Sequence, residues 1–242
     1  MTMNEPKKNK LKVPGYGDSF GTIFTNIPYR FIGHKLGLLI YKLPISGNMI
    51  SIFGMINGLI GSYFFSKGTY QFNLIGLLFF NLFYIFACTD GTVARLKGEV
   101  SLFGSYINHV TEKITYPVII MSICLSCDKI GYNHVIENIS LGYICVILIG
   151  TRLILYDVEV YIIDLSKKIS EFKDNSYKLI NSQFKPNFIY RLLLFNNSNL
   201  LVIITLGTLL NQLYWTIIFL TIYSILFTFA CIIRFGKIFI KY

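Results

Sequence analysis

Charged residues are scarce in this sequence. Asp, Glu, Lys and Arg make up 14% of the 242 residues, whereas hydrophobic residues make up 54%. Soluble domains carry about 25% charged residues, so this composition excludes an ordinary soluble protein and predicts an integral membrane protein. The uncharged runs leave too little polar chain for a separate soluble domain, and we therefore expect a single membrane domain.

The number and placement of the cysteines argue against a disulfide framework. The five cysteines are an odd number and lie mostly inside apolar segments: Cys88, Cys124, Cys127, Cys145 and Cys231. We interpret them as small buried hydrophobic residues, and we favour this over a redox or metal role for the Cys124–Cys127 pair. The first 25 residues contain no apolar run, so no secretory signal peptide is predicted.

Acidic residues are outnumbered by basic ones, 12 against 22, which gives a formal net charge of +10. We expect no nucleic-acid partner, because no basic patch belongs to a soluble fold. Membrane proteins concentrate Lys and Arg in their cytoplasmic loops. Eighteen of the 22 basic residues fall on one side of the predicted spans, together with both termini. That side is therefore predicted to be cytoplasmic.

The apolar runs predict six transmembrane helices, because a bilayer core requires about 20 apolar residues per helix. The predicted spans are residues 45–65, 68–89, 100–127 and 136–156, and two helices within 192–233 that divide at Asn211–Gln212. Residues 27–43 mix aromatic, apolar and basic side chains, which is typical of a helix lying in the membrane interface.

The predicted fold is therefore an all-α integral membrane protein with an N-terminal interfacial amphipathic helix. We expect a cytoplasmic N-terminal segment at 1–43, a six-helix membrane domain at 44–235 and a cytoplasmic tail at 236–242.

The chemically informative stretch lies between the second and third predicted spans. It reads Asp90-Gly91-Thr92-Val93-Ala94-Arg95 and continues to Gly104, Asn108 and Glu112. We predict a polar turn at 90–99, with Asp90 at the end of the preceding helix and Arg95 in the turn. Residues 104, 108 and 112 are four apart and should stack along one face of the next helix. Charge at a membrane edge is usually functional, and this set suits a metal-bridged pyrophosphate better than a packed core.

The pattern Asp-Gly-x2-Ala-Arg-x8-Gly-x3-Asn-x3-Glu resembles the signature of the CDP-alcohol phosphotransferases, also called CDP-alcohol phosphatidyltransferases. Residues Ile45 to Ser51 resemble the Ser-Pro-Asn segment at which that family's first membrane helix begins. The resemblance covers about residues 44–235. It implies transfer of a phosphoryl-alcohol group, such as a phosphatidyl group, from a CDP-linked donor to an alcohol acceptor, with release of CMP. It places the chain in phospholipid or cell-envelope polymer synthesis.

The same resemblance implies further partners and site residues. It implies Mg²⁺ or Mn²⁺ as cofactor, membrane lipid as a partner, and a homodimer. Glu112 corresponds to the catalytic base, and Asp90 and Asn108 correspond to metal ligands. The residues that correspond to the donor-binding positions are Asn48, Gly91, Ala94, Arg95 and Gly104. From its charge near the cytoplasmic end of the fourth span, Arg152 is a candidate for binding an anionic acceptor.

The chain departs from the family pattern at three of its four aspartates. Ala87, Asn108 and Glu112 stand at those positions, and only Asp90 is an aspartate. An amide oxygen binds hard cations without charge, so one ion is favoured over two. The loss of acidic ligands leaves an alternative function, a non-catalytic nucleotide- or lipid-binding membrane subunit of the same fold.

Several of these residues also have purely structural interpretations. Asp90 and Asn48 could cap helices, and the glycines could serve helix packing. Arg95 could be a charge anchor on the cytoplasmic side, and Arg152 could extend to the interface. Asn108 could form an interhelical hydrogen bond. Glu112 could pair with Lys113 or Arg152.

Overall fold

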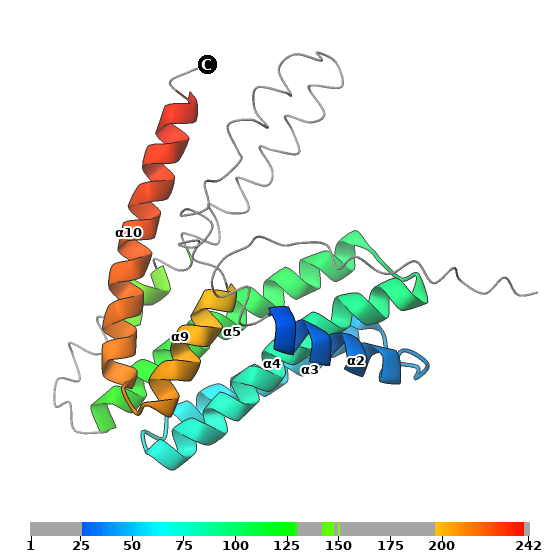
Figure 1. The fold of residues 1–242 in the computed structure, drawn as a ribbon, viewed down its shortest axis with the longest axis horizontal. Coiled ribbons are helices and arrows are strands. Elements are labelled where there is room, and N and C mark those ends of the chain that lie inside the picture. The colour runs from blue at the N-terminus through cyan, green and yellow to red at the C-terminus, as the bar shows by residue number, and fades with distance from the viewer. Residues whose placement is uncertain (1–25, 130–141, 148–149, 151–196, 240–242) are drawn as a thin grey trace, which may run out of the picture.

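The computed structural model describes residues 26–129, 142–147, 150 and 197–239. Every element in this part of the chain is a helix, which confirms the all-α prediction. Figure 1 shows the elements in chain order: η1 (Asn26–Arg30), α2 (Phe31–Ile40), α3 (Gly47–Phe65), α4 (Tyr70–Lys97), α5 (Leu102–Lys129), α9 (Asn197–Leu209) and α10 (Leu213–Phe239).

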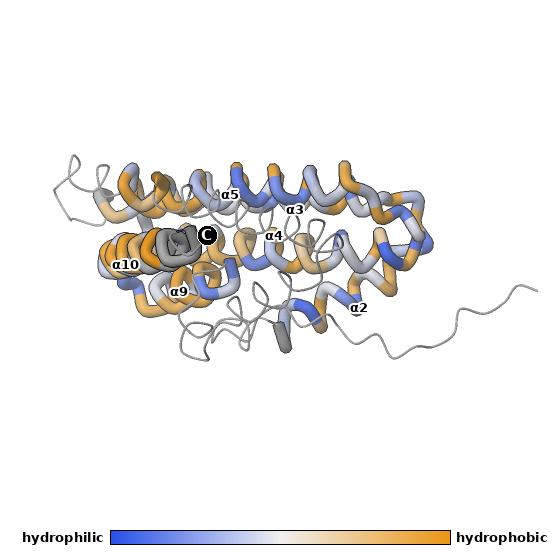
Figure 2. Tube along the Cα trace, turned by 90° about the horizontal axis from the view of Figure 1, so that it is seen from above, coloured by the Kyte–Doolittle hydropathy of each residue, from blue (hydrophilic) through white to orange (hydrophobic). Residues whose placement is uncertain are grey.

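Helices α3, α4 and α5 lie side by side, and each is long and apolar enough to cross a membrane (Figures 1 and 2). Glycines allow α3 to approach both neighbours. A Cβ atom on Gly61 would lie 2.9 Å from the backbone oxygen of Gly76 in α4. A Cβ atom on Gly58 would lie 2.2 Å from the Cγ2 atom of Thr115 in α5. Small residues at such contacts are how membrane helices pack closely, because the hydrophobic effect does not drive their association inside lipid.

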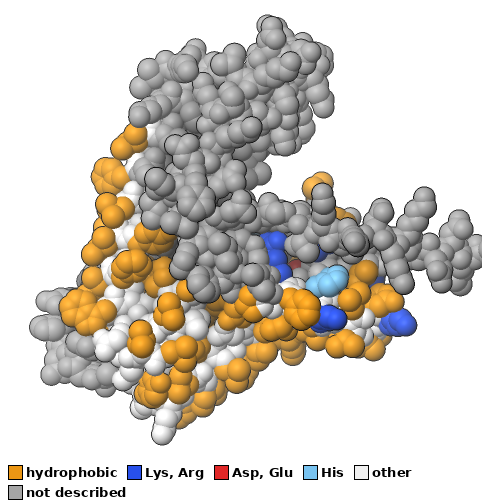
Figure 3. Space-filling model, viewed as in Figure 1, with side chains coloured by type: hydrophobic (Ala, Val, Ile, Leu, Met, Phe, Trp, Pro, Cys, Tyr) orange, Lys and Arg blue, Asp and Glu red, His pale blue; other side chains and the backbone are white. Residues whose placement is uncertain are grey.

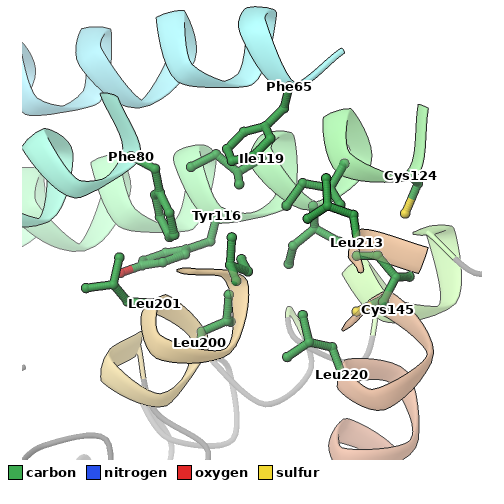
Figure 4. Packing of buried hydrophobic residues seen from close by; sticks show 14 of the residues in the cluster. Phe65, Phe80, Tyr116, Ile119, Cys124, Cys145, Leu200, Leu201, Leu213 and Leu220 are labelled. Carbon is green, nitrogen blue, oxygen red and sulfur yellow. The ribbon is translucent and has the colours of Figure 1, made fainter. Parts of the chain in front are cut away.

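The hydrophobic core lies where α9 and α10 pack against α4 and α5. The ring of Tyr116 in α5 meets Phe80 and Phe83 of α4 edge to face, at centroid distances of 5.9 and 5.6 Å. Leu200 and Leu201 of α9 lie on the other side of the Tyr116 ring (Figure 4). This packing fixes the beginning of α9 beside α4 and α5.

The predicted polar turn at 90–99 is wrong. Helix α4 continues through Asp90 and Arg95 to Lys97, and the helix is capped by Gly98 at φ 70°. A left-handed residue at a helix C-terminus favours glycine, and basic residues in the last turn interact favourably with the helix dipole. The charged residues therefore mark the end of the apolar run but not the end of the helix.

Three of the six predicted spans correspond to α3, α4 and α5, and the remaining three are not confirmed. The fourth, 136–156, lies mostly outside the described residues. The predicted break at Asn211–Gln212 coincides with the turn between α9 and α10, where Asn211 has a φ of 55°. Helix α9 and the stretch Leu213–Phe229 of α10 are apolar but shorter than a full span. Figure 2 shows hydrophobic positions along most of both helices.

The predicted interfacial segment at 27–43 covers η1 except its first residue and all of α2, and both helices pack on α4. A Cβ atom on Gly33 would lie 2.7 Å from the Cβ of Cys88, and one on Gly37 would lie 2.8 Å from Thr92 Cγ2. The same segment exposes large apolar side chains: Phe31, Ile32, Leu38, Leu39 and Leu43. Its location in the membrane interface stays a prediction.

Candidate active site

The candidate site lies where the beginning of α3 meets the last turns of α4 and the first turns of α5. A Cβ atom on Gly47 would lie 2.9 Å from the backbone oxygen of Asp90 and 3.1 Å from the Cβ of Ala94. A Cβ atom on Gly104 would lie 2.9 Å from Asn48 Oδ1. Two helices therefore approach the start of α3 at positions that the sequence pattern had singled out.

Asp90 is buried, with 7% of its surface exposed, and it lies well inside α4. Its Oδ2 atom accepts a hydrogen bond of 2.5 Å from the Ser51 hydroxyl of α3. Its Oδ1 atom accepts a hydrogen bond from the backbone N–H of Gly91. Asp90 is not the cap of a helix, because α4 begins twenty residues earlier at Tyr70 and ends at Lys97. The carboxylate is instead held against α3 by a neutral donor.

Glu112 lies in α5, and its Oε2 atom accepts a hydrogen bond of 2.9 Å from the Asn197 amide. Asn197 is the first residue of α9. The Asp90 carboxylate is close enough to repel Glu112 electrostatically, and the Lys113 ammonium attracts it. The other partner considered from the sequence, Arg152, lies outside the described residues. The structure thus brings the two acidic candidates into one neighbourhood.

Asn108 lies between Gly104 and Glu112 on the face that the four-residue spacing predicts, since all three belong to α5. Its Oδ1 atom is buried and has no hydrogen-bond partner in the described structure. The amide oxygen therefore does not form the interhelical hydrogen bond that was considered. A buried acceptor without a donor is energetically costly, and such an atom is suited to a cation or a ligand donor.

Arg95 lies one turn after Gly91 in α4 and folds back toward it. A Cβ atom on Gly91 would lie 3.2 Å from the guanidinium Nη1. The guanidinium attracts the Asp90 carboxylate. In Figure 3, hydrophobic side chains cover most of the described surface in view, and the visible Lys, Arg and His side chains gather toward the end that carries α2.

Asn48 is not the N-cap of α3. Ser46 has that position, and its hydroxyl accepts a hydrogen bond of 3.3 Å from the backbone N–H of Met49. The Asn48 side chain is directed instead at Gly104 of α5, as the 2.9 Å approach to its Oδ1 atom indicates.

Three residues at the site were not predicted from the sequence. Ser51 donates a hydrogen bond to Asp90, and the sequence marks it only as the last residue of the segment from Ile45 to Ser51. Asn197 binds Glu112 and belongs to a run of asparagines at the beginning of an apolar segment, which was a readable signal. Lys97 donates 2.8 Å hydrogen bonds to the carbonyls of Leu43 and Ile45, and it thereby fixes the connection into α3.

No group of three or more His, Cys, Asp or Glu side chains that could hold a metal ion occurs in the described residues. The two metal ligands predicted from the sequence, Asp90 and Asn108, are one carboxylate and one amide.

Comparison with curated proteins finds no match for this chain. The sequence profile of one family, CDP-alcohol phosphatidyltransferase, matches residues 45–223, which is well over half of the chain. Members of this family act in membranes on a CDP-alcohol donor and an alcohol acceptor, generally with divalent metal ions. Asp90, Gly91, Ala94, Arg95, Gly104, Asn108 and Glu112 all lie within the matched range. The chain therefore belongs to the CDP-alcohol phosphatidyltransferase family.

Proposed function

We propose that this protein transfers a phosphoryl-alcohol group from a CDP-linked donor to an alcohol acceptor and releases CMP. A phosphatidyl group is one such group, and the product would enter phospholipid or cell-envelope polymer synthesis. The observation that carries the proposal is that the start of α3 meets Asp90 of α4 through Ser51 and Gly104 of α5 through Asn48. Acidic side chains within membrane helices are costly, and they usually mark a functional site.

In the proposed reaction, Glu112 is the general base. The acceptor hydroxyl oxygen attacks the β-phosphorus of the donor, and the bond from that phosphorus to the CMP oxygen breaks. The hydroxyl proton passes to the Glu112 carboxylate, and CMP leaves with the bonding electrons. A base positioned in this way contributes about 10²–10⁴-fold to a rate.

The donor would lie at the start of α3, beside the small residues Gly91 and Ala94 of α4 and Gly104 of α5. The helices pack closely at these positions, and a larger side chain at Gly104 would collide with Asn48. Arg95 carries a planar guanidinium that suits a phosphate oxygen. Asn48 would contribute its amide to the nucleotide.

The side chains present fit one divalent cation. Asp90 and Asn108 would supply oxygen atoms, which are the ligands that Mg²⁺ and Mn²⁺ prefer, while Glu112 is the base beside them. The unpaired, buried Oδ1 of Asn108 is the observation that supports this fit, because a cation would satisfy it. Ala87 offers no side-chain oxygen, so the set does not fit two ions. When bound, the ion would stabilise negative charge on the pyrophosphate.

Other parts of the proposal rest on the sequence. The role of Arg152 in binding an anionic acceptor concerns a residue outside the described part of the chain. The cytoplasmic location of the site and of both termini rests on the distribution of Lys and Arg. The homodimer is an expectation from the family.

The test is CMP release by the full chain in proteoliposomes, with a panel of CDP-linked donors, CDP-diacylglycerol included, and a panel of alcohol acceptors. Asp90→Asn and Glu112→Gln should both abolish metal-dependent release. Glu99→Gln is the matched control, because Glu99 is an exposed acidic residue just beyond α4 and outside the site. If both site variants retain full turnover, the site assignment is wrong.

A thermal-shift panel with CMP, CDP, CTP and CDP-diacylglycerol, each with and without Mg²⁺ or Mn²⁺, complements the assay. A ligand at 100 times its dissociation constant should stabilise the protein by about 2.7 kcal/mol. A metal-dependent shift with cytidine nucleotides that is lost in Asp90→Asn supports the proposal. Nucleotide or lipid binding without turnover under any condition would instead support a non-catalytic subunit.

A further inference from the structure

We propose that Asn197 is a positioning residue that orients the Glu112 carboxylate for proton transfer; this inference rests on the function proposed above. The Asn197 Nδ2 atom donates a hydrogen bond of 2.9 Å to Glu112 Oε2. The two residues are 85 positions apart in the sequence and come from α9 and α5. The contact therefore exists only because the fold brings these helices together.

The beginning of α9 is held in place by contacts that do not involve Glu112. The Oγ atom of Ser198 lies 2.8 Å from the hydroxyl oxygen of Tyr84 in α4. Leu200 and Leu201 are 1% and 0% exposed, and they pack beside the Tyr116 ring (Figure 4). Asn197 thus projects from a fixed backbone, so its amide can define the position of the glutamate rather than follow it.

A glutamate needs such a partner more than a shorter acid does. Its side chain has three torsions, and each unfixed torsion adds rotamers in which the carboxylate points elsewhere. A catalytic group must be held within about 0.5 Å of its productive position. The bond to Asn197 occupies Oε2, and the acceptor proton would then pass to Oε1.

The donor is also chemically suited to a base. An amide is neutral, so it orients the carboxylate without cancelling the negative charge that accepts the proton. A lysine or arginine at position 197 would form a stronger contact but would compete with the proton and with a cation for that charge.

The first experiment measures kcat and KM for CMP release in proteoliposomes. Asn197→Ala should lower kcat by about 10–100-fold, the usual effect of removing a partner that orients a reacting group. The KM for the donor should change little, because the lost interaction serves the transition state. Asn197→Asp has the same shape but no amide donor, and kcat should fall at least as far.

Ser198→Ala is the matched control. It removes the hydroxyl that lies against Tyr84 and loosens the beginning of α9, but it leaves the Asn197 amide in place. Because Ser198 helps to hold the beginning of α9, kcat should fall, but by less than in Asn197→Ala. An equal loss of kcat in Ser198→Ala and Asn197→Ala would show that only the docking of α9 matters, and it would overturn the positioning role.

A length exchange tests the pair directly. Glu112→Asp shortens the acid by one methylene, and Asn197→Gln lengthens the amide by one. Each single substitution should lower kcat, and the double variant should recover part of the loss. If the double variant loses the product of the two single losses, the side chains do not act as a pair and the proposal fails.

Melting temperatures test the contact between Asn197 and Glu112 independently of catalysis. They are measured for Asn197→Ala, Glu112→Ala and the double variant. The effects of the single substitutions should not add, because both remove the same hydrogen bond. If the changes in melting temperature are not additive but the wild type releases no CMP, the contact exists, but the proposed function and the role of Glu112 as a base are wrong. CMP release with an unchanged kcat in Asn197→Ala would reject the positioning role alone.

Discussion

Ser51→Ala tests how far the site depends on the contact between α3 and α4. The substitution removes the hydroxyl that lies 2.5 Å from Asp90 Oδ2. A hydrogen bond to a charged group contributes about 1.5–3 kcal/mol. Because about 1.4 kcal/mol corresponds to a tenfold change, the variant should lose roughly 10–100-fold in metal-dependent CMP release.

Ser62→Ala is a control from the same helix. Ser62 is 3% exposed and Ser51 is 5% exposed, so both hydroxyls are buried to a similar degree. The Ser62 hydroxyl donates a hydrogen bond of 2.9 Å to the carbonyl of Gly58, one turn earlier in α3, and it makes no contact with Asp90. Ser62→Ala should therefore keep an activity close to that of the wild type.

The assay is the initial rate of CMP release at increasing Mn²⁺ concentration, for both variants and the wild type. Ser51→Ala should need more Mn²⁺ for half-maximal activity, because its Asp90 carboxylate is less well oriented. A wild-type rate and a wild-type Mn²⁺ dependence in Ser51→Ala would refute the reasoning. If Ser62→Ala loses as much CMP-releasing activity as Ser51→Ala, the effect arises from a general loosening of α3 and not from the bond to Asp90.

Three further substitutions have expected outcomes. Lys97→Met removes two 2.8 Å hydrogen bonds to carbonyls before α3. It should lower the free energy of unfolding by about 1–3 kcal/mol, measured by thermal melting, and Lys97→Arg should lose less stability. Gly58→Ala places a Cβ atom 2.2 Å from Thr115 Cγ2 and should cost about 1–3 kcal/mol of stability. Adding Thr115→Ser removes that methyl group and should restore most of the loss, and failure to do so would reject the predicted clash. Asn108→Asp adds a third carboxylate and should lower the Mn²⁺ concentration needed for CMP release; an unchanged titration would argue against Asn108 as a ligand.

The helices near the site could be predicted because their signals are local. The apolar run at 45–65 corresponds to α3, which begins after Ser46 at Gly47. The end of α4 is not predicted by the loss of hydrophobicity, because charged residues are compatible with the last turns of a helix that leaves the membrane. Gly98, with its φ of 70°, is the residue that could have marked the true end.

The candidate residues on α4 and α5 could be named from spacing alone, but their partners could not. Ser51 reaches Asp90 across 39 positions of sequence, and Asn197 reaches Glu112 across 85. No periodicity relates residues at such separations, because the contacts depend on which helices pack together. The approach of Gly104 to Asn48 could not be predicted from spacing either. The sequence alone does not distinguish a glycine at the site from one that only allows helices to pack.

The site has fewer acidic residues than the family pattern, and each of its two acids accepts a hydrogen bond from a neutral side chain. With Ala87 and Asn108 at two aspartate positions, attraction of a cation depends on the charges of Asp90 and Glu112. The negative charge of Asp90 acts on Glu112. Each accepts a hydrogen bond from a neutral side chain of another helix, Ser51 of α3 or Asn197 of α9, which holds it in place without neutralising it. Under the proposed function, orientation by α3 and α9 would compensate in part for the missing acids, and loss of either hydrogen bond should then weaken metal-dependent activity.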